Sequence, residues 1–212
     1  MKATDIAAVP PQYHSRSQRE AANQLGMWTL IATEILLFGG LFLAYAIYRG
    51  SYPDAFSRGS RLLDFRSGTI NTAVLLTSSL SMAMGDTFIR RGRRGVLGAC
   101  IACTGGLGLV FLCIKFMEYR DMFRSHLVPG INFAGNFPPQ VELFIFLYFA
   151  TTCLHAIHMI VGLTAMGWLF HLNREGRLSS EAHEPVKMVG LYWHFVDCIW
   201  VILYPLLYLI PR

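Results

Sequence analysis

Two ionisable side chains interrupt the last apolar stretch of the sequence. That stretch runs from Gly190 to Ile210, and it carries His194 and Asp197 in its first third. A spacing of three residues places both side chains on one face of a helix. Ionisable groups are costly inside a bilayer, so such residues mark either a functional site or a buried polar contact. We therefore expect His194 and Asp197 to meet polar groups on other helices.

Two histidines share another apolar stretch. His155 and His158 are also three residues apart, so both imidazoles can face the same way. Two such histidines can bind a metal when further ligands come from other helices, and Glu34, His194 and Asp197 are the candidates. Alternatively, each imidazole forms a hydrogen bond between helices, which is the usual use of polar groups in membrane bundles. The sequence favours hydrogen bonds, and we predict no metal site and no catalytic residue in this chain.

Glu34 is the single ionisable residue in the first apolar stretch. Three interpretations are open: a protonated, hydrogen-bonded carboxyl in the core, a partner for a protonated histidine, or a member of a proton relay. The first two are structural, and general experience with buried carboxyls favours them over the relay.

The composition indicates the class of protein that holds these residues. Of 212 residues, 54% are hydrophobic and 15% are charged, whereas soluble domains carry about 25% charged residues. The apolar residues form long blocks, as they do in membrane proteins. The net charge is +5, and most arginines lie between these blocks, where they orient the chain in the membrane. This pattern indicates an integral membrane protein and argues against nucleic acid as a partner.

Five apolar blocks predict an all-α fold, an integral membrane bundle of five transmembrane helices, because about 20 apolar residues span the hydrocarbon core as a helix. The predicted helices lie at about residues 26–48, 68–89, 96–117, 141–171 and 188–210. Residues 1–25 are polar and predict an N-terminal tail outside the bundle. The segments between the blocks are predicted to be loops.

The third block carries two patterns of small residues. Gly98, Ala102 and Gly106 recur every four residues, and such a face allows another helix to approach closely. Cys100 and Cys103 form a CxxC pair, which is often a redox or metal signal. No second CxxC accompanies the pair, so these cysteines, like the other three, are predicted to be packing residues.

Lys and Arg residues are distributed unequally between the two sides of the predicted bundle. On the side of the N-terminal tail, the tail carries three of them, the second loop four and the fourth loop three, ten in all. On the other side, the first loop carries four, the third loop two and the C-terminus one, seven in all. Basic loops stay in the cytoplasm, so the N-terminus is predicted to be cytoplasmic and the C-terminus periplasmic. Glu34, His194 and Asp197 then share one depth in the cytoplasmic half, while Glu118 and Glu142 lie at the outer surface.

Five stretches of the sequence form longer motifs. They are GMWTLIATEILLFGGLF at Gly26–Phe42, NTAVLLTSS at Asn71–Ser79, KFMEY at Lys115–Tyr119, LHAIHMIVG at Leu154–Gly162 and YWHFVDCIW at Tyr192–Trp200. Together they resemble the cytochrome c oxidase subunit III family of the haem-copper oxidases, in its short five-helix bacterial form. The motifs follow the order of that family and cover most of the chain, so the resemblance is specific.

The resemblance implies an accessory role in a respiratory complex. Members of the family have no redox centre and serve proton-pumping terminal oxidases, which pass electrons from cytochrome c to oxygen. They bind the catalytic subunit beside a proton-uptake path, hold phospholipid and sustain turnover. By resemblance, bound phospholipid is expected in this chain, no other cofactor is, and haem and copper belong to partner subunits.

The resemblance also implies roles for particular residues. It suggests a buried polar core that supports proton uptake, made of Glu34, His155, His158, His194 and Asp197. Tyr192 and Trp193 would lie near bound lipid. The mitochondrial form has two further helices at its start and holds lipid in a cleft beside them. Here a partner subunit would have to supply the other wall of that cleft.

The expected partners are the catalytic subunit I, subunits II and IV and membrane lipids, in the inner membrane of a bacterium. The ending VILYPLLYLI and the loop HLVPGINF resemble oxidases that work beside an alternative complex III, which suggests a supercomplex. Within the family, the alternatives are subunit III of a quinol oxidase and a nitric oxide reductase-associated protein. Two functions of other classes stay open: a stand-alone proton or solute carrier, and a two-histidine metal enzyme.

Overall fold

The computed structural model of the chain describes residues 15–131, 133 and 137–210. Its elements are α2 (Arg16–Ser51), α3 (Pro53–Arg61), α4 (Phe65–Arg90), α5 (Arg94–Arg124), α6 (Pro139–Arg174) and α7 (Glu184–Tyr208). Five of these helices, all except α3, are long and apolar enough to span a membrane. Hydrocarbon offers the backbone no hydrogen-bonding partner, so a spanning segment of this kind has to be helical. For the described residues, the predicted all-α bundle of five transmembrane helices is confirmed.

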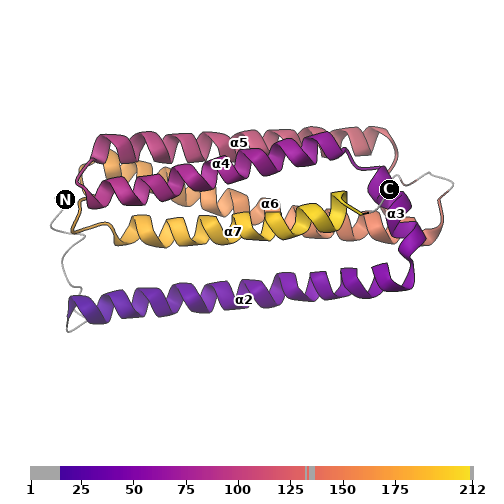
Figure 1. Cartoon of the computed structure of the whole chain (residues 1–212), viewed down its shortest axis with the longest axis horizontal. Coiled ribbons are helices and arrows are strands. Elements are labelled where there is room, and N and C mark those ends of the chain that lie inside the picture. The colour runs from indigo at the N-terminus through magenta and orange to yellow at the C-terminus, as the bar shows by residue number, and fades with distance from the viewer. Residues whose placement is uncertain (1–14, 132, 134–136, 211–212) are drawn as a thin grey trace.

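The long helices run side by side and alternate in direction along the chain (Figure 1). α4 and α6 each pack against both α5 and α7, which makes a four-helix bundle. α2 lies along one side of this bundle and contacts α6 and α7. Within the described part of the chain, α2 has no contact with α4 or α5. α7 is therefore the central helix, since α2, α4 and α6 all pack on it.

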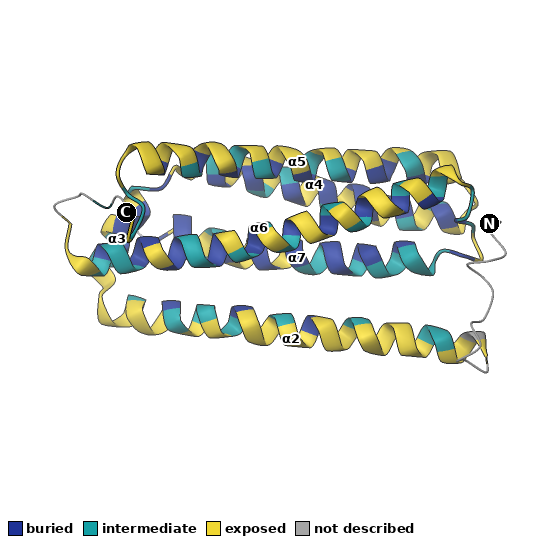
Figure 2. Cartoon of the chain, turned by 180° about the vertical axis from the view of Figure 1, so that it is seen from behind, coloured by how far each residue is buried: buried dark blue, intermediate teal, exposed yellow. Residues whose placement is uncertain are grey.

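Burial follows from this arrangement (Figure 2). The inward faces of α6 and α7 are buried, whereas most of α2 is exposed, because it touches the bundle along one face only. Among its described residues, the buried ones are Ile31, Phe38 and Tyr45. They are seven residues apart, which is about two turns of the helix, so all three lie on one face of α2. The exposed apolar remainder is the surface expected of a helix next to hydrocarbon.

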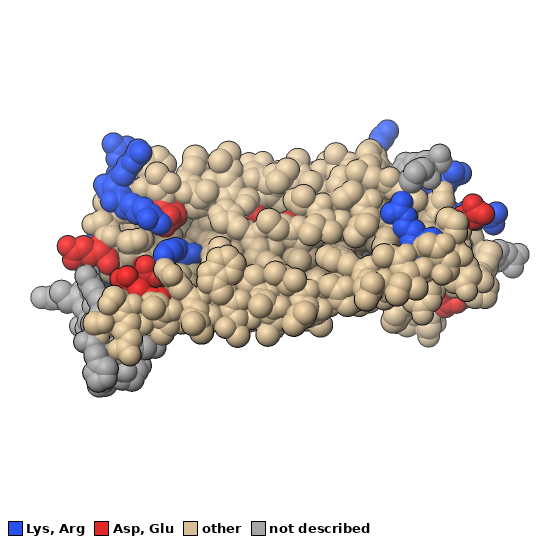
Figure 3. All heavy atoms as spheres, turned by 60° about the horizontal axis from the view of Figure 1, so that its bottom comes forward, with Lys and Arg blue, Asp and Glu red and all other residues tan. Residues whose placement is uncertain are grey.

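Charged side chains gather at the two ends of the bundle (Figure 3). Between the ends, the face shown is almost entirely uncharged, apart from a few acidic atoms near the middle of its length. This is the distribution of a protein whose ends reach the headgroup regions and whose middle lies in hydrocarbon.

α2 begins ten residues earlier than predicted, at Arg16 and not at residue 26. The hydroxyl of Ser15 caps it by accepting a hydrogen bond from the Gln18 amide at 3.2 Å. Residues 16–25 are polar but include good helix formers, and polar side chains do not end a helix that has started. Residues 16–25, which were predicted to belong to a tail, are therefore the first turns of α2. Residues 1–14 lie outside the described part of the chain.

A short helix, α3, occupies part of the predicted loop between the first two spans. Pro53 stands in its first turn, where the missing amide hydrogen costs nothing. Phe56 is fully buried and packs edge-on against Tyr45 and Phe144, with ring centroids 5.3 Å apart in each pair. Gly59 allows close approach, since a Cβ atom there would lie 2.3 Å from the Phe144 ring. α3 thus fastens the end of α2 to α6.

Asp64 begins α4 at the same end of the bundle. Its carboxylate accepts hydrogen bonds from the Arg66 amide at 3.0 Å and the Ser67 hydroxyl at 2.5 Å. The Ser67 hydrogen bond favours the ionised form and lowers the pKa of Asp64. A carboxylate at the N-terminus also interacts favourably with the helix dipole.

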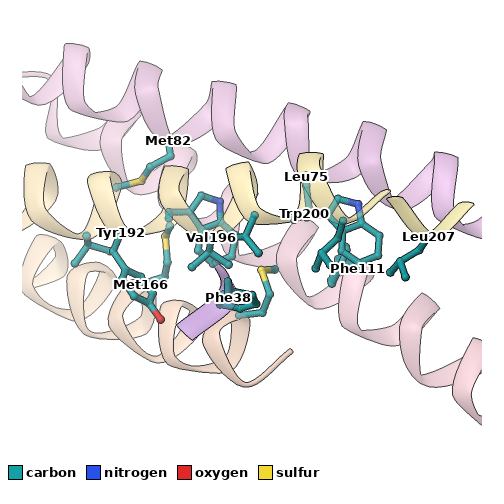
Figure 4. Close-up of a cluster of buried hydrophobic side chains, with 14 of the residues drawn as sticks. Phe38, Leu75, Met82, Phe111, Met166, Tyr192, Val196, Trp200 and Leu207 are labelled. Atoms are coloured by element: carbon teal, nitrogen blue, oxygen red, sulfur yellow. The ribbon is translucent and has the colours of Figure 1, made fainter. Parts of the chain in front are cut away.

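Aromatic side chains of α7 fill the centre of the bundle (Figure 4). Trp193 and Trp200 are fully buried, and Phe111 of α5 packs edge-on against Trp200 with ring centroids 4.8 Å apart. Two glycines make room for Trp193. A Cβ atom on Gly108 would lie 2.7 Å from its ring, and one on Gly162 would lie 2.9 Å from it. In a membrane, such close packing rather than hydrophobic burial holds helices together.

Within this chain, the predicted small-residue face of α5 packs against a neighbouring helix at one of its three members. Only Gly98 meets a neighbour, because a Cβ atom there would lie 2.8 Å from the side-chain amide of Asn173. Ala102 and Gly106 are exposed and border a hollow between α5 and α6. The buried face of α5 is rotated away from them and carries Gly108 instead. A four-residue repeat alone does not indicate which way a helix is turned.

Candidate functional site

Glu34 and His158 join α2 to the bundle. The Oε2 atom of Glu34 lies 2.8 Å from Nε2 of His158, and both side chains are mostly buried. The other ring nitrogen, Nδ1, donates to the backbone carbonyl of Leu154 at 2.8 Å. Because Nδ1 carries a hydrogen, the bond between Nε2 and Oε2 contains a single proton. The pair is electrically neutral whichever of the two atoms holds that proton, which suits a membrane interior.

Neighbouring groups hold the Glu34–His158 pair in position. The ring of Phe38, one turn along α2, packs against the imidazole with centroids 5.3 Å apart. The hydroxyl of Tyr192 donates to the backbone carbonyl of His158 at 3.2 Å. Residues of α2, α6 and α7 therefore meet at this point, and the pair is a fixed contact rather than a free carboxyl.

His194 and Asp197 do not bond to each other. Nδ1 of His194 forms a hydrogen bond with the Ser79 hydroxyl of α4 at 2.6 Å. Asp197 is 3% exposed, and within the described chain neither of its carboxyl oxygens has a hydrogen-bond partner. The two residues share the α4 side of α7, as their spacing predicts, and the Ser79 side chain that bonds to His194 also lies beside Asp197.

His155 is buried in the centre, away from His158. It is 1% exposed, and neither ring nitrogen has a hydrogen-bond partner among the described residues. Its ring packs against Phe111 and Trp200, with centroid distances of 5.5 and 5.3 Å. The two histidines thus point to different neighbours, because three residues along a helix turn a side chain by about 60° from its original direction.

The five predicted polar residues therefore form several contacts and not one site. Within the described chain, no three His, Cys, Asp or Glu side chains lie close enough together to hold a metal ion. The geometry offers interhelical hydrogen bonds, one of them sharing a proton. The buried side chains of His155 and Asp197 form no direct hydrogen bond that meets normal geometry among the described residues.

A second polar cluster was not predicted. Lys115 of α5 is 3% exposed, and its ammonium group donates to Glu118 Oε2 at 2.9 Å, to the Tyr148 hydroxyl at 3.1 Å and to the Tyr208 hydroxyl at 2.7 Å. The Tyr208 hydroxyl donates in turn to Glu118 Oε1 at 2.7 Å. All three ammonium hydrogens are therefore used, and the cluster links α5, α6 and α7.

Aromatic rings surround this ammonium group. Nζ of Lys115 lies 4.9 Å from the ring centroids of Tyr148 and Trp200, within the range of cation–π attraction. Glu118, which was predicted to lie at the depth of the outer membrane surface, points into the bundle and is 7% exposed. Its depth in the membrane stays a prediction. The signal was present in the sequence, because Lys115 and Glu118 are three residues apart on one helical face. Glu142, in the first turn of α6, is half-buried.

The lipid contacts implied for Tyr192 and Trp193 are not visible on this chain. Trp193 has no exposed surface, and its indole nitrogen donates to the Ser78 hydroxyl at 3.1 Å. Tyr192 is 8% exposed. Both side chains point into the bundle, because the glycines opposite Trp193 give it room there.

Comparison with known proteins places the chain in a family. The sequence matches the family described as Cytochrome c oxidase subunit III over residues 12–211. It is 32% identical to cytochrome c oxidase subunit 3 of Thermostichus vulcanus over 189 residues, 89% of this chain and 87% of the relative. It is 29% identical to cytochrome bo(3) ubiquinol oxidase subunit 3 of Pseudomonas putida over 188 residues, 88% of this chain and 84% of the relative.

A further relative is much longer than this chain. Heme-copper oxidase subunit I+III of Aeropyrum pernix is 29% identical over 193 residues, which are 87% of this chain and 22% of that protein. The family match includes all five spanning helices and both sides of the Glu34–His158 contact. The chain belongs to the cytochrome c oxidase subunit III family.

Proposed function

We propose that the chain is an accessory subunit III, without a redox centre of its own, of a bacterial proton-pumping haem-copper terminal oxidase that uses cytochrome c. The family match over residues 12–211 carries the proposal. The similarity to a relative named subunit I+III supports catalytic subunit I as the direct neighbour. Subunits II and IV complete the proposed complex, and haem and copper belong to the partner subunits.

In this role, the polar contacts hold the bundle together and support proton uptake. The Glu34–His158 pair is the contact best suited to the second task, because it shares one proton and is only mostly, not fully, buried. That proton can move between the carboxyl and the imidazole without leaving a net charge in the membrane. The Lys115 cluster, in contrast, has all three ammonium hydrogens engaged and serves the packing of three helices.

The direct experiment is purification of the native complex through a tag on this chain. We expect haem-bearing subunits to co-purify in fixed proportion and the complex to consume oxygen. The isolated chain should contain no haem. A chain that purifies alone and transports protons or a solute in vesicles would instead be the stand-alone carrier, and stoichiometric metal in the isolated chain would favour the metal enzyme.

A quinol oxidase is the second candidate function. The relative from Pseudomonas putida, which is named a ubiquinol oxidase subunit, matches as large a share of this chain as the cytochrome c oxidase relative. Oxygen consumption by the purified complex with reduced cytochrome c, and separately with a quinol, discriminates the two. Native gels of the same membranes test the further proposal of a supercomplex with an alternative complex III.

We also propose a phospholipid site between α5 and α6. A hollow of about 390 Å³ there has an apolar lining that includes Ala102, Gly106 and Phe170. Because Ala102 and Gly106 are small, they leave space for an acyl chain. At one end, the guanidinium of Arg174 lies over the Phe170 ring, 5.3 Å from its centroid. A basic group beside an apolar groove is suited to an anionic headgroup.

Lipid mass spectrometry of the purified complex tests this site. Arg174→Gln should lower the amount of retained anionic phospholipid, and Ala102→Phe should lower it as well, by filling the hollow. Arg120→Gln, at an exposed arginine near the other end of α5, is the matched control and should retain the lipid. Unchanged lipid content in both groove variants would refute the site.

We propose that the chain lies in the bacterial inner membrane with its N-terminus in the cytoplasm and its C-terminus in the periplasm. The distribution of Lys and Arg supports this orientation. Reporter fusions at the two ends test it, with a phosphatase active only in the periplasm. Phosphatase activity at the N-terminus would reverse the orientation.

A further inference from the structure

One face of α7 lies uncovered between α2 and α4. α7 contacts both helices, but α2 and α4 do not touch each other in the described chain. Cys198, Val201 and Ile202 are exposed along this face, and His194 is half-buried on it. Towards the α3 end, the face continues into a hollow of about 550 Å³ that α2 and α7 line together. We call this surface the α7 groove.

His194 brings an unused hydrogen-bonding atom into the α7 groove. Its Nδ1 is bonded to Ser79, and no hydrogen bond from the described chain reaches its Nε2. Unlike the nitrogens of His155, this atom is not among the buried unpaired ones, so it reaches the surface. His194 is ten residues into α7, roughly 15 Å from its start, which is within the hydrocarbon region. The acyl chains of lipids cannot form a hydrogen bond with Nε2 at this depth.

Several exposed hydroxyl side chains on the spanning helices are bonded within their own helix. Their hydroxyls donate to backbone carbonyls of their own helices, as do those of Thr29, Thr33, Thr77, Thr87 and Thr164. Such side chains can face lipid without an unmet donor. The imidazole of His194, in contrast, is bonded through Nδ1 only, so its Nε2 requires a partner from outside the described chain. This distinguishes the α7 groove from the lipid-facing surfaces of α5 and α6.

We propose that a transmembrane helix of another subunit lies in the α7 groove and that one of its polar side chains bonds to Nε2 of His194. At this depth a membrane-spanning protein can offer a hydrogen-bonding side chain to Nε2, whereas the acyl chains of lipids cannot. The Ser79 hydroxyl can donate or accept, so either tautomer of His194 is available. The partner residue is therefore a hydroxyl, amide or carboxyl side chain. The inference rests on the proposed function, which supplies the other subunit.

Photocrosslinking in the assembled complex tests the groove. Benzoylphenylalanine replaces Cys198 on the α7 groove, and in a control it replaces Ile157, which is 57% exposed on α6. We expect irradiation of native membranes to join the Cys198 variant to a polypeptide, with a yield clearly above that of the Ile157 control. A complex that keeps its haem-bearing subunits but shows no excess adduct at position 198 overturns this inference and leaves the proposed function intact. Failure of any subunit to co-purify would instead overturn the proposed function.

Substitution of the histidine tests the hydrogen bond. His194→Leu should weaken retention of the partner in detergent by about three- to tenfold, the effect of one interhelical hydrogen bond. His194→Gln places an amide near the position of Nε2 and should restore retention. Ser79→Ala removes a hydroxyl that lies beside His194 and Asp197 inside this chain and leaves Nε2 of His194 in place, so it should retain the partner. Equal losses in His194→Leu and Ser79→Ala, without rescue by glutamine, would show that His194 acts only inside this chain.

Discussion

Replacing Glu118 by alanine leaves the ammonium group of Lys115 buried without its carboxylate partner. Both side chains of the pair are 4% exposed, so water cannot take the place of the lost carboxylate. Removing one member of a buried ion pair costs about 3–5 kcal/mol, because the remaining charge stays desolvated. The Tyr208 hydroxyl loses its acceptor as well. We therefore expect Glu118→Ala to lower the free energy of unfolding by at least about 3 kcal/mol.

A double variant separates the charge from the packing. Lys115→Met combined with Glu118→Gln removes both charges, fills a similar volume and keeps an oxygen acceptor for Tyr208. We expect this variant to lie within about 1.5 kcal/mol of the native protein. Lys115→Met and Glu118→Gln should then each lower the free energy of unfolding more when made alone than when the other change is already present. The coupling energy between them should be about 2 kcal/mol.

Unfolding of the full chain by SDS in detergent micelles measures these differences. Trp193 and Trp200 are fully buried, so their fluorescence reports the loss of packing. If Glu118→Ala changed the free energy of unfolding by less than about 0.5 kcal/mol, the size of a surface effect, the buried pair would not exist as described. Simple addition of the two single costs in the double variant would also refute the reasoning.

Three further changes have definite expected results. Gly108→Ala should cost about 1–3 kcal/mol in the same SDS titration, because the new methyl group would lie 2.7 Å from a buried indole ring. Asp64→Ala should cost about 1 kcal/mol through loss of the cap of α4. Since the Ser67 hydrogen bond lowers the pKa of Asp64, this contribution is present above the ordinary carboxyl pKa of about 3.9 and is lost as the pH falls through the lowered value, which a pH series of midpoints checks. Glu34→Ala should leave the haem content of the complex nearly unchanged while shortening its active lifetime or slowing proton uptake, which oxygen-consumption time courses and measurements of proton uptake check.

Matched variants keep these tests specific. Gly106→Ala adds a methyl group where nothing lies within 4 Å, so it should change stability little, and an equal loss would contradict the packing argument. Asp64→Asn keeps a capping side chain but cannot ionise, so the native pH dependence should disappear in it. Loss of haem from the Glu34→Ala complex would be inconsistent with a peripheral subunit.

The number of spanning helices could be predicted because it is a local property. Each span needs about 20 apolar residues and satisfies its backbone hydrogen bonds internally, so neighbouring helices do not alter the pattern. The helix ends could not be predicted in the same way. α2 and α5 continue into polar sequence at residues 16–25 and 118–124, and hydropathy does not distinguish a polar helix from a loop. α3 was missed for the same reason.

The residues of the polar contacts could be found, but their partners could not. Glu34 and His158 stand out because ionisable groups are rare in a membrane, yet the sequence treats His155 and His158 alike. Only the rotation of α6 decides that His158 faces α2 and that His155 faces the aromatic centre. The same limitation hid the burial of Glu118 inside the bundle, because position along the chain predicts the depth of a residue and not the direction of its side chain.

The sequence by itself determined that the chain is a five-span membrane protein, and its motifs indicated the family that the comparison establishes. Both properties are local: the number of spans follows from the lengths of the apolar segments, and the family follows from the order of residues in the motifs. The tertiary structure decided which side of each helix faces inward, since α2 touches α7 and not α4, and Trp193 enters the space left by two glycines. Helix rotation and neighbour choice depend on packing between distant segments. For that reason only the assembled bundle shows His194 with one nitrogen bonded and the other directed outward.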